Sequence, residues 1–278
     1  MIDLHLHTTA SDGEYSPAAL LALAMKAGVR TLSVTDHDTM VAVPEVCELG
    51  AVAGVDVVPG IEVTAVWQGR DVHILGYFPA VTPPGLEAFL VVQRGYRIER
   101  LRAIASRLAA LGVAVDVDGL LAERGAGGQS LGRPHLAQAL VQAGHAVSVQ
   151  AAFDRWLGDG RAAWVAREGV TPERVIHAIS DAGGIASLAH PGVGRGRRLV
   201  RLLAGLGLQA VEVFHSQHDL AMQQRLLDEA QRLQLMVTGG SDFHGDAGHR
   251  AGHLGRVGLP PEHFEVLRDR LRHVTRVR

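Results

Sequence analysis

Histidine and carboxylate residues recur in short motifs along this sequence, and together they have the chemistry of a metal site. Imidazole nitrogens and carboxylate oxygens bind divalent transition metals, and a set without thiolates suits manganese, iron or zinc better than calcium or magnesium. The single cysteine, Cys47, excludes a thiolate-clustered zinc site and an internal disulfide framework. The candidate metal ligands are His5, His7, Asp12, His37, Glu62, His73, His190, Asp242 and His244.

Most of these candidates stand at or just beyond the end of a predicted strand. Apolar and polar residues alternate from Ile2 onward, which is strand periodicity and puts His5 and His7 on the same side. Because the carboxyl ends of the strands in a parallel α/β barrel converge on one face, we expect the ligands to meet there. Several carboxylates buried in one place would repel one another, and divalent cations relieve that repulsion.

The order of the predicted elements indicates the fold class. Short apolar runs alternate with helical stretches, several of which begin at a Ser-Pro or Thr-Pro pair or end at glycine. This alternation predicts an α/β protein with a parallel sheet or barrel. The strands are predicted at 2–7, 31–35, 55–58, 71–77, 185–189, 209–214 and 235–238, and the helices at 16–28, 43–53, 171–183, 219–233 and 260–271.

The alternation of strands and helices stops between Pro83 and Glu168. That stretch predicts only helices, at 86–111, 117–124, 134–144 and 149–157, with a glycine-rich loop at 125–128. We therefore expect an α/β body built from residues 1–82 and 169–278, with a helical insertion at 83–168 that contributes to the substrate pocket.

Composition and charge limit the possible partners. The chain has 278 residues, 27 of them basic and 29 acidic, for a net charge of −2. Proteins that coat long nucleic acid usually carry a clear basic excess, so no long nucleic acid is expected, whereas small anionic substrates remain compatible. No apolar run approaches the ~20 residues that span a bilayer, and the N-terminus lacks the features of a secretory signal. We expect a cytoplasmic protein with no membrane partner.

Seven motifs follow one another along the chain: Asp3-Leu4-His5-Leu6-His7-Thr8, Ser11-Asp12-Gly13, Thr35-Asp36-His37-Asp38, Gly60-Ile61-Glu62, His73, Ala189-His190-Pro191 and Gly240-Ser241-Asp242-Phe243-His244. Their residue types and their order along the chain resemble the successive motifs of the PHP family, which is named for polymerase and histidinol phosphatase. Gly132-Arg133-Pro134-His135 in the insertion narrows the resemblance to the 3′,5′-nucleoside bisphosphate phosphatases, whose relatives include 5′-to-3′ exoribonucleases. The resemblance implies a distorted (β/α)7 barrel, the PHP fold, with two or three divalent metal ions, expected to be Mn2+.

The resemblance also implies how the ligands group. Many family members with three metals have a histidine where this chain has Asp12. The third site would then bind metal more weakly, or Asp12 would act as an acid or base near the leaving oxygen. The implied groups are His5, His7, Glu62 and Asp242 for one metal, Glu62, His73 and His190 for a second, and Asp12, His37 and His244 for a third.

Arginines in the insertion are the candidates for a second phosphate contact, because a guanidinium matches phosphate oxygens bidentately. On spacing alone, Arg97 and Arg100 would form a solvated face paired with Glu99. The resemblance instead implies that Arg100 contacts the substrate. His215 ends a predicted strand, and the sequence leaves open whether its side chain reaches the site. The resemblance implies Asp12 and His37 as catalytic residues, and as substrate contacts Asp12, His37, Glu99, Arg100, Arg133, Pro134, His135 and His244.

The expected function is a metal-dependent phosphatase that removes the 3′-phosphate from 3′,5′-nucleoside bisphosphates, for example pAp to AMP and phosphate. Divalent metals neutralise a phosphate ester and lower the pKa of bound water. One alternative is a 5′-to-3′ exoribonuclease that uses the same site on short 5′-phosphorylated RNA. A histidinol phosphate phosphatase would have no evident use for a second phosphate pocket. A non-catalytic PHP module that binds metal or a partner is disfavoured by the complete ligand set.

Overall fold

The computed structural model describes residues 1–125, 127–192, 196–247 and 251–276. The strands are β1 (Ile2–Leu6), β2 (Thr31–Val34), β3 (Asp56–Val57), β4 (Gly60–Trp67), β5 (Arg70–Tyr77), β6 (Ile185–Leu188), β7 (Ala210–His215) and β8 (Met236–Gly240). The helices are α1 (Pro17–Lys26), α2 (Val43–Ala53), α3 (Leu86–Ala110), α4 (Val117–Arg124), α5 (Arg133–Gln142), α6 (Val149–Ala152), the π-helix η1 (Phe153–Leu157), α7 (Pro172–Asp181), α8 (Gly196–Ala204), α9 (Leu220–Leu233) and α10 (Pro261–Arg276). The predicted α/β class is confirmed.

Two sheets form the centre of the molecule. One is a parallel sheet in the order β1-β2-β3, and the other has the order β4-β5-β6-β7-β8. Isolated bridges connect the two sheets, between Leu6 and Phe243 at one edge and between His37 and Glu62 at the other. Both connections fall inside the ligand motifs, so the sheets meet where the candidate ligands lie. Closure into a seven-strand barrel stays a prediction.

The β4–β5 hairpin corrects the expectation of purely parallel pairing. The residue pattern predicts no strand at Glu62, whereas the structure places Glu62 on β4 and pairs β4 with β5 and β5 with β6 in antiparallel fashion. Gln68 and Gly69 form the hairpin turn with φ of 51° and 73°, and two positive φ values match the twist of a tight two-residue turn. The hairpin carries Glu62 on one strand and His73 on the next, and so brings them together without a crossover helix.

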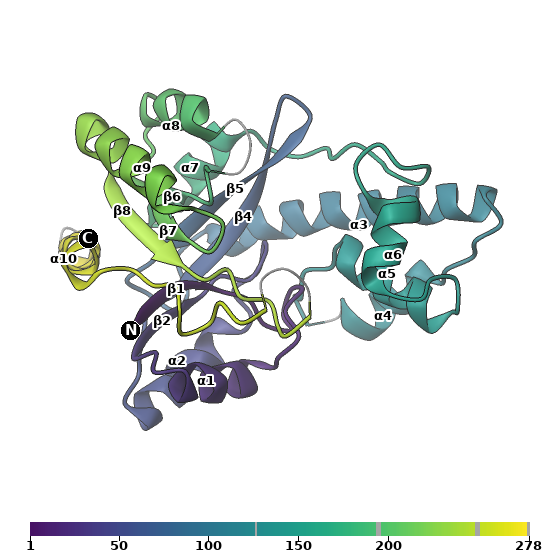
Figure 1. Cartoon of the computed structure of the whole chain (residues 1–278), viewed down its shortest axis with the longest axis horizontal. Coiled ribbons are helices and arrows are strands. Elements are labelled where there is room, and N and C mark those ends of the chain that lie inside the picture. The colour runs from purple at the N-terminus through teal and green to yellow at the C-terminus, as the bar shows by residue number, and fades with distance from the viewer. Residues whose placement is uncertain (126, 193–195, 248–250, 277–278) are drawn as a thin grey trace.

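Three hydrophobic clusters hold these elements. Helices α7 to α10 pack on the five-stranded sheet, and α1 and α2 pack on the three-stranded sheet. A third cluster lies among α3, α4, α5, α6 and η1. Figure 1 shows α4, α5 and α6 at one end of the molecule, joined to the sheets by the length of α3. The helices predicted at 86–111 and 117–124 are confirmed within a residue, whereas the one predicted at 149–157 is α6 followed by η1.

Helix α3 belongs to two of these clusters. Its first turns bury Leu86 and Leu90 against the sheets, and its later turns bury Leu101, Ile104 and Leu108 in the helical cluster. A single rigid element therefore places the helical region relative to the sheet edge that holds the candidate ligands. Among the described helices, none combines the length and apolarity needed to cross a membrane.

Candidate functional site

Glu62 lies at the centre of a cluster of imidazole rings. Its side chain is 1% exposed, and the ring nitrogens of five histidines lie 2.9–3.4 Å from its two oxygens. The contacts divide between the two oxygens of one carboxylate. Three histidines face Oε2 and two face Oε1: His5, His7 and His37 on Oε2, and His73 and His190 on Oε1. The geometry fits a carboxylate that serves two neighbouring groups of ligands.

A deep group joins the Oε2 side of Glu62 to Asp242. Nε2 of His5 and Nε2 of His7 each lie 3.3 Å from Asp242 Oδ1. These side chains are 0–1% exposed, so they form the floor of the cluster. His215 Nδ1 accepts from the backbone N–H of Gln217, which leaves its Nε2–H to donate to Asp242 Oδ2 at 3.2 Å. His215, left open by the sequence, therefore fixes the orientation of Asp242.

A shallower group lies around Asp12, whose side chain is 16% exposed. Its Oδ1 lies 3.4 Å from His244 Nε2, 3.8 Å from His37 Nε2 and 3.9 Å from His7 Nδ1. The two nitrogens of His37 thus face different carboxylates, Glu62 and Asp12. The structure brings all nine predicted ligands into one connected cluster, in groups that overlap through His37 and Glu62.

The backbone around these ligands is bent in ways that ordinary strands are not. Asp38, His190 and Asp242 have positive φ values of 52°, 33° and 55°, an unusual conformation for non-glycine residues that concentrates at functional sites. At Gly240, a Cβ would lie 2.4 Å from the backbone nitrogen of His5. Glycine there lets the end of β8 approach β1, where the Asp242 N–H donates to the His5 carbonyl at 2.9 Å.

Charge within the cluster is strongly coupled. Burial would raise the pKa of Glu62, but His73, His37 and His5 hold it well below its usual range. Burial would lower the pKa of His7, but its contacts with Asp242 and Glu62 raise it to about 9. Burial would raise the pKa of Asp12, but His37 and His244 hold it well below its usual range. An ionised Asp12 suits a metal ligand or a base better than an acid.

The residues present fit bound divalent cations. His5 Nε2, His7 Nε2 and His37 Nδ1 are buried and make no hydrogen bond to any described residue, although each lies near Glu62 Oε2. Their N···O separations of 3.1–3.4 Å match the ~3.0–3.4 Å between adjacent ligands that share one cation at ~2.1 Å. Metal ligation is therefore the chemistry that best satisfies these atoms.

Outer hydrogen bonds also point the histidines inward. Nδ1 of His5 faces Glu212 at 2.8 Å, Nδ1 of His7 faces the Ser11 hydroxyl at 3.5 Å, and Nδ1 of His244 faces the Asp242 carbonyl at 2.9 Å. Each partner can accept the Nδ1–H, which leaves the lone pair on Nε2. Glu212 was missed from the sequence; the available signal was a single acid between the apolar residues 210–211 and 213–214 of a predicted strand.

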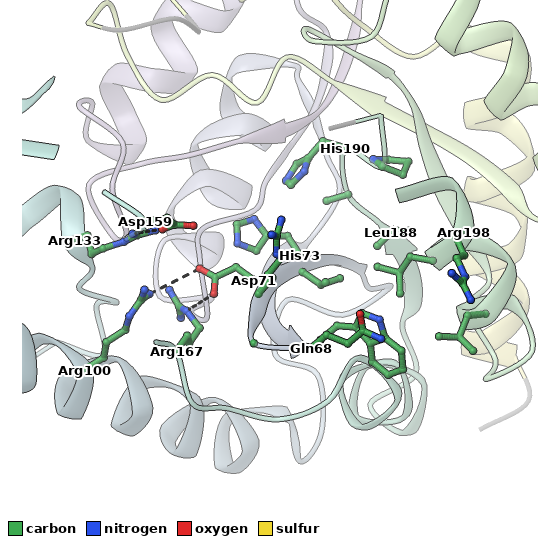
Figure 2. A pocket seen from close by; sticks show the side chains of 18 of the residues that line it. Gln68, Asp71, His73, Arg100, Arg133, Asp159, Arg167, Leu188, His190 and Arg198 are labelled. Atoms are coloured by element: carbon green, nitrogen blue, oxygen red, sulfur yellow. Dashed lines mark hydrogen bonds and ion pairs between the residues drawn. The ribbon is translucent and has the colours of Figure 1, made fainter. Parts of the chain in front are cut away.

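A cavity of about 720 Å³ opens beside the cluster. Figure 2 shows His73 and His190 between two sides of this cavity, with Arg100, Arg133 and Arg167 on one side and Leu188 and Arg198 on the other. The cavity therefore connects the candidate metal ligands to a group of three guanidinium ions, which we call the arginine side.

Acidic groups only partly neutralise the arginine side. Arg167 Nε lies 3.0 Å from Asp71, Arg100 Nη1 lies 3.8 Å from the same carboxylate, and Arg133 Nη1 donates to Asp159 at 2.8 Å. Burial lowers the pKa of Arg167 to about 10, and Arg97 also contributes. Three cations facing two carboxylates leave a net positive charge that suits an anion. Arg167 lies near the end of the predicted insertion in a segment without regular structure, and no sequence motif marked it.

Several predicted substrate contacts lie elsewhere. Pro134 and His135 are at the start of α5, and the His135 ring accepts from the Gly132 N–H at 3.1 Å. Glu99 is exposed on α3. Glu99, Pro134 and His135 are not among the described residues that line the cavity.

The solvated-face interpretation of Arg97 and Arg100 is wrong. Arg97 is 7% exposed, and its Nε donates to Asp38 Oδ2 at 2.5 Å while its Nη2 donates to the Thr64 hydroxyl at 2.8 Å. Arg100 is 8% exposed and donates to the Val165 carbonyl. Charged side chains on α3 are buried here because partners on other elements satisfy them, which spacing within the helix cannot reveal.

Comparisons with known proteins agree with this site. Residues 3–154 match the family described as PHP domain. The chain is 36% identical to the 5′-3′ exoribonuclease Rnm of Escherichia coli (87% of this chain and 84% of that one) and 33% identical to the 3′,5′-nucleoside bisphosphate phosphatase of Chromobacterium violaceum (94% and 93%). It is 36% identical to the phosphoribosyl 1,2-cyclic phosphate 1,2-diphosphodiesterase of Eggerthella lenta (91% and 97%).

A comparison with solved structures extends the similarity to the fold. A protein from Bifidobacterium adolescentis described as a metal-dependent phosphoesterase superposes with a TM-score of 0.85 at 30% identity, covering 96% of this chain and 95% of that one. The relatives differ in the phosphate ester they are named for but share the cleavage of such esters. On the family match, the extent of these similarities and the Glu62-centred cluster, the chain belongs to the PHP domain family and is a metal-dependent phosphoesterase.

Proposed function

We propose that this protein removes the 3′-phosphate from 3′,5′-nucleoside bisphosphates such as pAp, with two or three Mn2+ ions held by the nine clustered ligands. The observation that carries the proposal is the cavity that joins His73 and His190 to Arg100, Arg133 and Arg167. A substrate with two phosphates would place one at the ligand cluster and the other on the arginine side. A substrate with a single phosphate would leave the arginine side without a partner.

The reaction breaks one bond and forms another. Bound divalent cations would neutralise the phosphate and activate a water molecule. The water oxygen bonds to phosphorus and the bond from phosphorus to the 3′ oxygen breaks, while a proton lost by the water ends on the 3′ oxygen. Asp12 Oδ1 and His37 Nε2 face one another at 3.8 Å on the partly exposed rim, where they can hold or pass that proton.

We also propose how the sheets close and how the chain divides into a body and an insertion. The two sheets would form the wall of a distorted (β/α)7 barrel, with ligand motifs at both of its seams. Residues 83–168 would act as the insertion that supplies Arg100 and Arg133, between body segments 1–82 and 169–278. The separate hydrophobic cluster of the helical region supports this division.

A second candidate function is 5′-to-3′ cleavage of short RNA. The cavity continues past His190 to Leu188 and Arg198, and its lining also includes Leu199 and Leu202 from the same helix as Arg198. We call this the less polar side, because it carries one arginine where the arginine side carries three. The same bond to the 3′ oxygen is broken when the scissile phosphate carries a further nucleoside in place of hydrogen. That nucleoside would need space away from the arginine side, which the less polar side offers.

A phosphate-release and product panel tests these alternatives. The substrates are pAp, 3′-AMP, the dinucleotide pApA and histidinol phosphate, each with the Mn2+-loaded protein. The proposal expects pAp to exceed 3′-AMP in kcat/KM by about ten- to a hundredfold, the value of one charge-assisted phosphate contact. Equal values for pAp and 3′-AMP would contradict the proposal. Faster cleavage of pApA than of pAp would make the exoribonuclease the main activity, and no cleavage of any ester would favour a binding module.

A further inference from the structure

Glu212 on β7 is a buried carboxylate that touches two different ligand groups. Its Oε1 accepts from His5 Nδ1 at 2.8 Å, and its Oε2 accepts from the backbone N–H of His190 at 2.7 Å. Its exposure is 0%. His5 faces the Oε2 side of Glu62, and His190 faces the Oε1 side. One carboxylate therefore holds a member of each group.

An irregularity in β7 gives Glu212 this position. The pairing of β7 with β8 shifts register between Glu212 and Phe214. In a regular strand, residues 212 and 214 would share a face, whereas here Glu212 and His215 both contact cluster residues. The carbonyl of Val213, within the irregularity, accepts from His218 Nδ1 at 2.8 Å. The bulge thus turns two polar side chains of one short strand toward the ligands.

The contact with His5 determines which ring nitrogen carries the proton. A carboxylate can only accept at Oε1, so Nδ1 must donate. The lone pair of a neutral ring is then on Nε2, which lies 3.4 Å from Glu62 Oε2 and 3.3 Å from Asp242 Oδ1. Without the carboxylate, the ring could place its proton on Nε2 and lose the ability to ligate there.

The contact with His190 supports a strained backbone. His190 has φ of 33°, and a non-glycine residue keeps a positive φ only where the surrounding structure enforces it. The bond from its N–H to Glu212 Oε2 is short, and its acceptor is shielded from water. This bond helps to direct the His190 ring toward Glu62 Oε1, 3.2 Å away.

We propose that Glu212 is a positioning residue that couples the two ligand groups, so that its loss weakens metal binding at both. The inference rests on the proposed metal occupancy of the cluster. A residue that hydrogen-bonds to the second ring nitrogen of a metal-binding histidine typically contributes about ten- to a hundredfold in metal affinity. We expect a loss of affinity in the same range at each of the two sites.

The test variant is Glu212→Gln, which has the same shape but one acceptor fewer. If the amide oxygen faces the His190 N–H, the amide NH2 faces His5 Nδ1 and forces the ring proton onto Nε2. If the amide is reversed, its NH2 opposes the His190 N–H. The matched control is Glu229→Gln on α9, where Glu229 is also largely buried but pairs with Arg201 and Arg232.

Metal-stripped wild type, Glu212→Gln and Glu229→Gln are titrated with Mn2+ by calorimetry, and electron paramagnetic resonance monitors the coupled Mn–Mn signal. We expect Glu212→Gln to lose about ten- to a hundredfold in affinity for Mn2+ at both sites. It should also lose the coupled Mn–Mn signal at the Mn2+ concentration where wild type shows it. The control should behave like wild type. Loss at one site only, or at neither, would overturn the inference.

One further measurement and one substitute variant complete the test. Ring 15N shifts of His5 in the metal-free protein should show the proton moved from Nδ1 to Nε2 in Glu212→Gln where the amide oxygen faces the His190 N–H, and an unchanged ring together with unchanged metal affinity would overturn the inference. If that variant does not fold, Glu212→Asp is used, because a carboxylate shorter by one methylene is drawn back from both partners and should also weaken both sites. These metal-binding measurements contain no phosphate ester. Their outcome therefore does not depend on whether the protein cleaves 3′,5′-nucleoside bisphosphates.

Discussion

The Glu62 cluster and the arginine side of the cavity lie next to each other but use charge in opposite ways. The cluster gathers carboxylates and imidazoles on short side chains within strands or just beyond their ends, with Glu62 only 1% exposed. The arginine side uses long side chains from helices and an irregular segment, and Arg133 is 21% exposed. A buried cluster of imidazoles and carboxylates suits cations and bond cleavage. A basic cavity side suits recognition of a second anion.

This contrast predicts different consequences when each region is altered. A change in the cluster should reduce the cleavage of every phosphate ester, because all of them need the same ligands. A change on the arginine side should reduce only the cleavage of substrates that carry a second phosphate. The ratio of rates on pAp and 3′-AMP therefore tells the two regions apart.

The largest effect is expected at Glu62. Glu62→Gln keeps the shape of the side chain but removes the charge that both ligand groups share, and metal-assisted charge stabilisation contributes several kcal/mol to catalysis. We expect kcat/KM to fall by about three orders of magnitude or more on pAp and on 3′-AMP alike. Elemental analysis should show fewer than two bound metals per chain, with circular dichroism unchanged.

The control for that prediction is Glu45→Gln on the exposed first turn of α2, which should leave rates and metal content unchanged. Full activity of Glu62→Gln with less than one metal per chain would contradict the role of the cluster. It would also remove the reason to separate the two regions.

The second effect concerns the rim of the cluster, at Asp12 and His37. If these residues pass a proton to the leaving oxygen, His37→Ala should slow cleavage of an alkyl ester such as pAp by about 10²- to 10⁴-fold. Nitrophenyl phosphate has a leaving group that needs no proton and should lose much less. Equal losses on both substrates would assign His37 and Asp12 to metal binding alone.

The third effect is confined to the arginine side. Arg133→Ala and Arg167→Ala should each lower kcat/KM for pAp by about ten- to a hundredfold, the range of one charge-assisted contact to phosphate. Cleavage of 3′-AMP should change little, since 3′-AMP has no second phosphate. Arg102→Ala is the matched control, because Arg102 is 59% exposed and pairs with Asp118. An equal loss of kcat/KM on pAp and 3′-AMP would instead mean that these arginines take part in the bond cleavage at the cluster.

The two regions also differ in how far sequence could predict them. Ligands such as His37 and His190 follow short, largely apolar strands, and strand ends of an α/β fold converge, so their meeting place was predictable from pattern. The grouping around Glu62 came from family resemblance, because spacing cannot tell which carboxylate lies between which rings. Glu212 needed knowledge of a strand irregularity and of a contact between residues 207 positions apart.

The arginine side was harder to predict for a physical reason. Arg97 and Arg100 share a helix, and their partners Asp38 and Asp71 belong to the strands and loops that α3 packs against. Helical periodicity describes which side chains share a face but not what that face meets. Arg167 lies in an irregular segment with no periodicity at all, so only the folded chain relates it to Asp71.

The smallest effect is expected at Glu99, beside Arg100 in sequence but exposed on α3. The resemblance implies a substrate contact there, whereas an acidic side chain would repel a phosphate and is absent from the described lining of the cavity. Surface substitutions away from such contacts usually change stability by less than about 0.5 kcal/mol, so Glu99→Ala should change kcat/KM for pAp by less than about threefold. Steady-state kinetics with pAp and 3′-AMP measure this. A loss of tenfold or more confined to pAp would mean that α3 turns or shifts when substrate binds, and the arginine side would then be a surface completed by the substrate itself.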